Sequence, residues 1–260
     1  ILRGGYPAIW KTDDEGRNFL LSNYYTTYVE RALRSMINIE GLTQFNTFIR
    51  LCAGRIGSEC NASALSVEVG VSVPTIQSWL SILEASYIIY RLHPYHANIG
   101  KRLTKTPKLY FYDTGLLCSL LEISSASQLA THYLRGELFE NMIINELIKK
   151  ELNNGRNPDF TFWRDSNGNE VDLIQNKDNE IFAYEIKSGA TFNMNYFKGL
   201  NYWANLSHAD AEHKTVIFGG GNSMKTTDGE LVSWDKVQIK ASMRQFLNSL
   251  SIIIKTSEAF

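Results

Sequence analysis

Two neighbouring segments are the most informative about the fold: Asn169-Glu-Val-Asp-Leu-Ile174 and Tyr184-Glu-Ile-Lys-Ser-Gly189. Polar and apolar side chains alternate in both segments, as in half-buried β-strands, and the turn-forming residues between them predict a hairpin. Glu185 and Lys187 share one face of the second strand. Because the two strands are hairpin neighbours, we expect Asp172 to lie beside Glu185, with Lys187 close to both.

A helix predicted over residues 133–153 precedes these strands and contains Gly136-Glu-Leu-Phe-Glu140. Helical spacing puts Glu140 on the same side as Ile143 and Leu147, which mark the buried stripe. An unpaired carboxylate is costly in such a place. We therefore expect Glu140 either to join the strand carboxylates or to form a structural ion pair.

Three carboxylates and one lysine, ordered helix, strand, strand, suit metal-dependent cleavage of a phosphodiester. Close carboxylates repel one another, and a divalent cation relieves the repulsion. Oxygen ligands favour Mg²⁺ or Mn²⁺ over zinc, so Asp172, Glu185 and Glu140 are the predicted metal ligands. Lys187 would stabilise charge at the phosphate, which makes these four residues the predicted catalytic set. The alternative is that Glu185 and Lys187 form an exposed strand pair and Asp172 is an acid near a turn.

Residues 61–88 carry a helix-turn-helix pattern. We predict a first helix over 62–69, a turn at Gly70-Val-Ser72 and a second helix over 73–86, with Ser72 as its N-cap. Trp79 is expected at the edge of the apolar stripe of the second helix. Small polar residues on its outward face suit contacts with DNA: Thr75, Gln77, Ser78 and Ser81.

Two strands are predicted at 87–92 and 108–113, joined by a basic connection. Helices followed by such a hairpin make a winged helix. The basic residues assigned to the tip of the wing are Lys101, Arg102, Lys105 and Lys108. The predicted recognition helix itself has no Arg or Lys, so the wing would carry the phosphate contacts. A fold of this kind can also serve protein contacts alone, and that alternative stays open.

The remaining elements complete an α+β chain. Residues 17–54 are predicted to be helical, with no sign of chemistry. Beyond the hairpin we predict a mixed sheet flanked by helices. Its other elements are strands at 160–164, 215–219 and 230–233 and helices at 194–206 and 237–250.

Composition limits the class of protein. The 260 residues carry a net charge of −1, which does not by itself point to nucleic acid. Three scattered cysteines, Cys52, Cys60 and Cys118, argue against a disulfide framework and against a zinc site, and favour a reducing cytoplasm. No apolar run predicts a membrane span. The first residue is Ile1 rather than Met, so we expect a fragment of a longer protein.

The order helix-Glu140, strand-Asp172, strand-Glu185-Ile-Lys187 resembles the PD-(D/E)xK nuclease superfamily, to which type II restriction enzymes and archaeal Holliday-junction resolvases belong. The proline that usually precedes the aspartate is Val171 here. The resemblance implies a restriction-endonuclease-like domain with Mg²⁺ or Mn²⁺ as cofactor.

A resemblance that covers nearly the whole chain is to a prokaryotic AAA-type ATPase family. It rests on five stretches: Gly4-Gly-Tyr-Pro7, Gly70-Val-Ser72, Pro107-Lys-Leu-Tyr-Phe-Tyr-Asp-Thr-Gly115, Gly136 to Glu140, and Glu185-Ile-Lys187. In that family a P-loop ATPase domain is followed by a C-terminal region of unknown function, and this chain resembles the C-terminal region. The resemblance implies that ATP is bound only by a domain outside this chain.

One glycine-rich stretch could be mistaken for a phosphate-binding loop. Thr215-Val-Ile-Phe-Gly-Gly-Gly-Asn-Ser-Met-Lys-Thr226 has the strand and the glycines, but Met224 stands where the pattern needs glycine. The residues that follow favour a turn over the amphipathic helix that a P-loop opens. We expect no ATP site here.

The sequence therefore predicts three regions: a helical linker region at 1–60, a winged helix-turn-helix at 61–118 and a PD-(D/E)xK nuclease-like domain at 119–260. The predicted function is that of a Mg²⁺-dependent DNA endonuclease or a relic of one, acting as the effector part of an ATPase. Its expected partners are DNA and the ATPase domain of the same polypeptide, with no membrane. The alternative is a catalytically inactive module for DNA binding or protein docking. RNA as substrate and the oligomeric state stay open.

Overall fold

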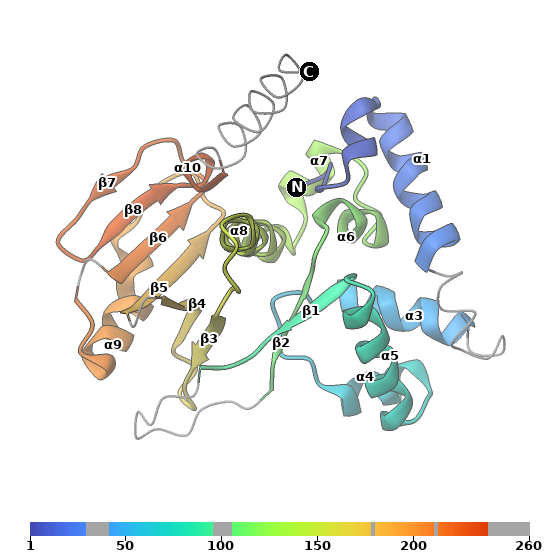
Figure 1. Cartoon of the computed structure of the whole chain (residues 1–260), viewed down its shortest axis with the longest axis horizontal. Helices are drawn as coiled ribbons and strands as arrows, with labels where there is room; N and C mark the ends of the chain where they lie inside the picture. The colour runs from blue at the N-terminus through green and yellow to red at the C-terminus, as the bar shows by residue number, and fades with distance from the viewer. Residues whose placement is uncertain (30–41, 96–105, 178–179, 211–212, 239–260) are drawn as a thin grey trace, which may run out of the picture. The chain divides into compact units, whose positions relative to one another are not determined.

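The computed structural model describes residues 1–29, 42–95, 106–177, 180–210 and 213–238 (Figure 1). The chain divides into two compact units. Unit 1 comprises residues 1–94 and 104–142, and unit 2 comprises residues 95–103 and 143–260. A two-stranded sheet, a mixed six-stranded sheet and the helices around them confirm the predicted α+β class. Among the residues described, no helix is long and apolar enough to cross a membrane.

Unit 1 is mostly helical. Its helices are α1 (Asp14–Tyr24), α3 (Leu42–Ala53), α4 (Ala62–Val69), α5 (Val73–Ala85), α6 (Thr114–Leu120), α7 (Ala126–Thr131) and the start of α8 (Arg135–Asn153). A 3-10 helix (Pro7–Lys11) precedes α1 and a π-helical turn (Tyr25–Val29) follows it. The predicted helical stretch 17–54 is therefore confirmed where it is described; residues 30–41 lie outside that part.

The helix pair α4–α5 has the predicted turn. Gly70 ends α4 in the left-handed conformation, with φ 77°, which glycine adopts without strain. Ser72 caps α5 by accepting a hydrogen bond from the Thr75 amide. Trp79 is not at the edge of the apolar stripe as predicted: it is 4% exposed, with its ring against those of Phe45 and Phe48 from α3. Periodicity within α5 could not show that α3 covers this ring.

The strands β1 (Ile89–Leu92) and β2 (Lys108–Phe111) form the predicted antiparallel hairpin. A third segment continues the pairing, since the amide of Gly57 donates to the carbonyl of Leu109 and that of Cys60 to the carbonyl of Pro107. Lys108 is 3% exposed and so does not belong to an exposed basic tip, as the sequence had suggested. The joining residues 96–105 lie outside the described part.

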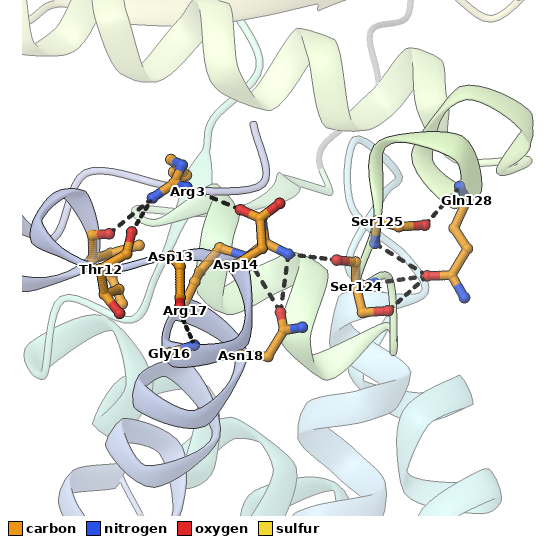
Figure 2. A network of polar contacts seen from close by, with 11 residues as sticks. Arg3, Thr12, Asp13, Asp14, Gly16, Arg17, Asn18, Ser124, Ser125 and Gln128 are labelled. Atoms are coloured by element: carbon orange, nitrogen blue, oxygen red, sulfur yellow. Dashed lines mark hydrogen bonds and ion pairs between the residues drawn. The ribbon is translucent and has the colours of Figure 1, made fainter.

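Hydrogen bonds and ion pairs of two arginines, Arg3 and Arg17, hold the N-terminal segment against the rest of unit 1 (Figure 2). Arg3 donates from Nη1 to the carbonyls of Ile9 and Thr12 and pairs with Asp14. Arg17 is buried; it also pairs with Asp14, and its Nη2 donates to the carbonyl of Ser124. These contacts tie the start of α1 to the segment that leads into α7.

A second set of hydrogen bonds joins two of the stretches on which the ATPase-family resemblance rests, residues 4–7 and 107–115. The buried carboxylate of Asp113 accepts a hydrogen bond from the Gly5 amide at 2.6 Å and caps α6 by accepting from the Leu116 amide at 2.7 Å. A Cβ on Gly4 would lie 2.3 Å from Asp113 Oδ1, and φ of Gly4 is +60°, so this position requires glycine. The Gly-Gly turn and the Asp-Thr-Gly turn thus form one contact.

Replacing this carboxylate should destabilise unit 1. Asp113→Ala removes the acceptor for two backbone amides, and we expect a loss of about 2–4 kcal/mol from the cap and the second bond together. Urea unfolding measures the loss. Asp13→Ala is the matched control, because the exposed side chain of Asp13 caps α1 by accepting a hydrogen bond from one backbone amide, that of Gly16. Equal losses in the two variants would contradict the double role of Asp113.

Unit 2 is built on a mixed sheet of six strands in the order β3-β4-β5-β6-β8-β7 (Figure 1). The strands are β3 (Phe160–Arg164), β4 (Glu170–Lys177), β5 (Glu180–Lys187), β6 (Lys214–Phe218), β7 (Met224–Lys225) and β8 (Glu230–Ser233). β3, β4 and β5 pair antiparallel, as the predicted hairpins require. β5, β6 and β8 run parallel, so their carboxyl ends lie at the same edge.

Helices cover the two faces of this sheet. A 3-10 turn (Met194–Phe197) leads into α9 (Lys198–Ser207), and Leu200 and Trp203 pack in one core with Ile174 and Ala183. The other face carries Gln175 and Tyr184, which hydrogen-bond each other. Glu151, near the end of α8, accepts a hydrogen bond from Gln175 and so lies on this second face. The predicted mixed sheet with flanking helices is what unit 2 contains.

The glycine-rich stretch after β6 has no P-loop geometry. A two-residue strand, β7, follows it instead of a helix. A Cβ on Gly219 would lie 2.5 Å from the Ser188 carbonyl oxygen, and one on Gly220 would lie 2.4 Å from that of Ala190. The glycines therefore allow two chain segments to pack closely. A short helix, α10 (Trp234–Gln238), ends the described part; the rest of the helix predicted at 237–250 lies outside it.

Candidate functional site

The candidate site of unit 2 lies where the pairing of β4 with β5 stops. The last paired residues at this end are Leu173 and Tyr184. Beyond them the Ile186 amide donates a 2.7 Å hydrogen bond to Asp172 Oδ2 rather than to a backbone carbonyl. The side chain of Asp172 thus replaces the next ladder bond, which holds its carboxylate against β5. Asp172 is 8% exposed.

Lys187 joins the two strands through its ammonium group. Its Nζ lies 2.5 Å from Glu185 Oε1 and 3.8 Å from Asp172 Oδ2. The side chains of Asp172 and Glu185 are 11% and 12% exposed and that of Lys187 is 36% exposed. The three groups that strand parity predicted to converge are therefore in contact. The carboxylates are largely withdrawn from water, whereas the Lys187 ammonium group stays accessible, so water screens this charge-assisted contact in part.

The cluster lies at the edge of an open sheet where two parallel strands, β5 and β6, end. Lys187 ends β5, and Phe218 is its partner at the end of the parallel strand β6. The Gly219 amide donates to the carbonyls of Lys187 and Gly189, so the loops that leave these two strands are joined. In open sheets with parallel strands, ligands bind outside the carboxyl ends of the strands. The cluster stands at such an edge.

Glu140 lies in unit 1 and has partners there. Its Oε1 is 3.6 Å from Lys108 Nζ and accepts a hydrogen bond from the Tyr110 hydroxyl. The side chains of Lys108 and Glu140 are 4% and 12% exposed. The next residue, Asn141, is fully buried and bonds both the amide and the carbonyl of Phe111. The first part of α8 is therefore attached to β2 by two consecutive polar side chains.

The ion pair of Glu140 is one of the two outcomes that helical phase allowed. Sequence reasoning missed its partners, because Lys108 was assigned to the wing and Tyr110 to no role. The available signal was strand parity: Lys108 and Tyr110 stand two apart in a predicted strand and so share a face. Strand parity does not show which helix covers that face, because this depends on the tertiary packing of α8 against β2.

The donor set fits a divalent cation in part. Asp172 and Glu185 supply oxygen ligands on neighbouring strands, and the Lys187 ammonium supplies the positive charge between them. In the described part of the chain, no group of three or more His, Cys, Asp or Glu side chains is arranged to hold a metal ion. The pair in unit 2 is thus the part of the predicted metal set that the structure brings together.

The predicted DNA-contacting residues of α5 are partly available. Gln77 and Ser78 are exposed on the helix surface. Thr75 is half-buried, and its hydroxyl lies 2.7 Å from that of Ser72, within the helix cap. Ser81 is exposed too, and its hydroxyl donates to the carbonyl of Gln77. Three predicted contacts of the wing, Lys101, Arg102 and Lys105, lie outside the described residues.

The chain matches two families of unknown function. Residues 1–127 match a domain of unknown function (DUF8612), and residues 135–237 match a second one (DUF4143). The point between the two matches falls just before α8.

The curated relatives are uncharacterized proteins. The chain is 29% identical over 192 residues to Rv2008c of Mycobacterium tuberculosis and to Mb2031c of Mycobacterium bovis, alignments that cover 73% of this chain and 42% of each relative. It is 22% identical over 223 residues to an uncharacterized protein of Haemophilus influenzae, which covers 84% of this chain and 50% of the relative. The chain thus spans half or less of the length of these relatives. No solved structure matches it.

Proposed function

We propose that unit 2 is a nuclease-like domain that binds Mg²⁺ or Mn²⁺ through Asp172 and Glu185 and cleaves a phosphodiester bond of DNA with the help of Lys187. The observation that carries this proposal is the contact of one ammonium group with a buried and a partly buried carboxylate, where the start of β4 lies beside the end of β5. The desolvation cost of an ion pair withdrawn from water offsets most of its attraction, so such a pair adds little net stability to a fold. A function at this sheet edge therefore explains the charged cluster better than stability does.

The carboxylates and the lysine of this cluster would have different roles in the reaction. Asp172 and Glu185 would hold the cation, which when bound supplies Lewis-acid activation of the phosphate. Lys187 is more exposed than either carboxylate, so its ammonium can turn toward a phosphate oxygen and stabilise the negative charge that develops there. The Ile186 amide holds the Asp172 carboxylate in place against β5 through its 2.7 Å hydrogen bond to Oδ2.

We propose that α4, α5 and the β1–β2 hairpin act as a winged helix-turn-helix that brings DNA to this chain. The supporting features are the capped helix pair and the exposed Gln77 and Ser78 on its second helix. The ATPase-family resemblance and the greater length of the curated relatives support a P-loop ATPase domain as the partner within the whole protein. Three free, buried cysteines agree with a cytoplasmic setting.

Calorimetric titration with Mn²⁺ tests the proposal directly. The chain should bind Mn²⁺, and Asp172→Ala should lose this binding, because the variant keeps only one carboxylate of the pair. Glu180→Ala is the matched control: Glu180 is an exposed acid at the opposite end of β5 and should not affect binding. If the unchanged chain binds no Mn²⁺, or if Asp172→Ala binds it as well as Glu180→Ala does, the metal site is wrong.

The second candidate is a catalytically inactive module of the same fold that binds DNA or a protein. The observation in its favour is the engagement of Glu140 with Lys108 and Tyr110, which gives the third predicted metal ligand a structural task. Retained DNA binding without Mn²⁺ binding would support this alternative over the nuclease.

A further inference from the structure

The first turn of α9 lies directly on the candidate site of unit 2. Gly199 is the second residue of this helix. A Cβ built on Gly199 would lie 2.6 Å from the carbonyl oxygen of Glu170 and 3.5 Å from Glu185 Oε2. Real Cβ atoms do not approach a backbone oxygen to 2.6 Å, so any side chain here would move α9 or the start of β4.

Gly199 is not required by its backbone conformation. It lies within a helix and not in the left-handed region, where glycine is favoured. Glycine is also a poorer helix former than alanine. The close approach to β4 and β5 is the feature that explains a glycine here.

We propose that Gly199 is a positioning residue for the cluster of Asp172, Glu185 and Lys187; this inference rests on the proposed function. Glu170 is two residues before Asp172 on β4, so α9 braces the strand end that carries this aspartate. The same turn of α9 limits the space of the Glu185 carboxylate. Because Gly199 has no Cβ, the first turn of α9 can pack against both strands. In this way it sets the separation of the two carboxylates that Lys187 contacts.

The test is Gly199→Ala, with Gly136→Ala as its matched control. Gly136 is also the second residue of a helix, α8, and a Cβ there would meet nothing within 4 Å. We expect Gly199→Ala to remain folded by circular dichroism but to bind Mn²⁺ at least tenfold more weakly in calorimetry. Gly136→Ala should bind it with unchanged affinity. Unchanged affinity in Gly199→Ala, or loss of its fold, would overturn the positioning role.

A second measurement separates this inference from the proposed function. Lys187→Ala is introduced into the unchanged chain and into Gly199→Ala, and the shift in Tm is compared. If Gly199 sets the cluster, the shift that Lys187→Ala causes should shrink or vanish in the Gly199→Ala background, whether or not the chain binds metal. Equal shifts in both backgrounds would refute the role of Gly199, whereas absent Mn²⁺ binding with unequal shifts would refute only the metal site.

Discussion

Lys187→Ala is expected to lower the rate of plasmid nicking in Mg²⁺ by about 100-fold or more, the usual cost of removing one group that stabilises transition-state charge. The Lys187 ammonium group contacts both carboxylates, at 2.5 Å from Glu185 Oε1 and 3.8 Å from Asp172 Oδ2. The variant keeps both of these carboxylates. Its Mn²⁺ binding should therefore survive while its turnover is lost.

The control for this experiment is Lys225→Ala. Lys225 lies on the edge strand β7 with an 86% exposed side chain and pairs with Glu230. Loss of one surface charge there should leave nicking nearly unchanged. Undiminished nicking by Lys187→Ala would remove Lys187 from the catalytic set. If neither the unchanged chain nor Lys225→Ala nicks DNA although both bind Mn²⁺, the inactive module gains.

Glu140→Ala is expected to lower the free energy of unfolding by about 3–5 kcal/mol, the range for breaking a buried ion pair by removing one partner. The change takes the carboxylate away from Lys108, whose side chain is 4% exposed, and from the hydroxyl of the fully buried Tyr110. A buried ammonium that loses its counter-charge pays most of its desolvation cost. Urea unfolding followed by circular dichroism measures the loss.

Glu146→Ala is the matched control for this change. Glu146 is on the same helix, α8, and pairs with Lys149 at 2.9 Å, but the lysine side chain is 47% exposed. An exposed helical pair contributes about 0.5 kcal/mol or less. The contrast between the two glutamates therefore tests burial rather than charge. A loss in Glu140→Ala no larger than that in Glu146→Ala would contradict the structural role of the Lys108 contact.

A further variant, Glu140→Gln, separates the two possible roles of Glu140. Glu140→Gln keeps the shape of the side chain and its bond to Tyr110 but removes the negative charge. As a metal ligand, Glu140 would show weakened Mn²⁺ binding in this variant; as a partner of Lys108 alone, it would show lowered stability with unchanged binding. The prediction that Glu140 belongs to the metal set is decided by this comparison.

Local pattern was sufficient for most of unit 2. The strand at 160–164 and the two strands that carry Asp172 and Glu185 are encoded by short-range alternation, and local hydrogen bonds shape the turn at Asp165 that follows β3. Asp165 illustrates this: although burial raises its pKa, hydrogen bonds from Asn169, Asn167 and Tyr202 lower it overall, and two of these donors lie within four residues. Parity also brought Asp172, Glu185 and Lys187 onto adjacent positions. These inferences succeed because neighbouring strands of a hairpin leave few registers to choose from.

The amino-acid pattern was enough to predict the α+β class, the capped helix pair, the order of the strands along the chain and the meeting of three charged residues where β4 starts and β5 ends. It could not show that α3 covers Trp79, that Lys108 is buried with Glu140 and Tyr110, or that Gly199 lies against the carboxylate pair. The difference comes from how far apart in the sequence the interacting residues lie. Periodicity shows which face of an element is apolar, whereas the partner that covers the face comes from a distant segment, and packing alone selects it.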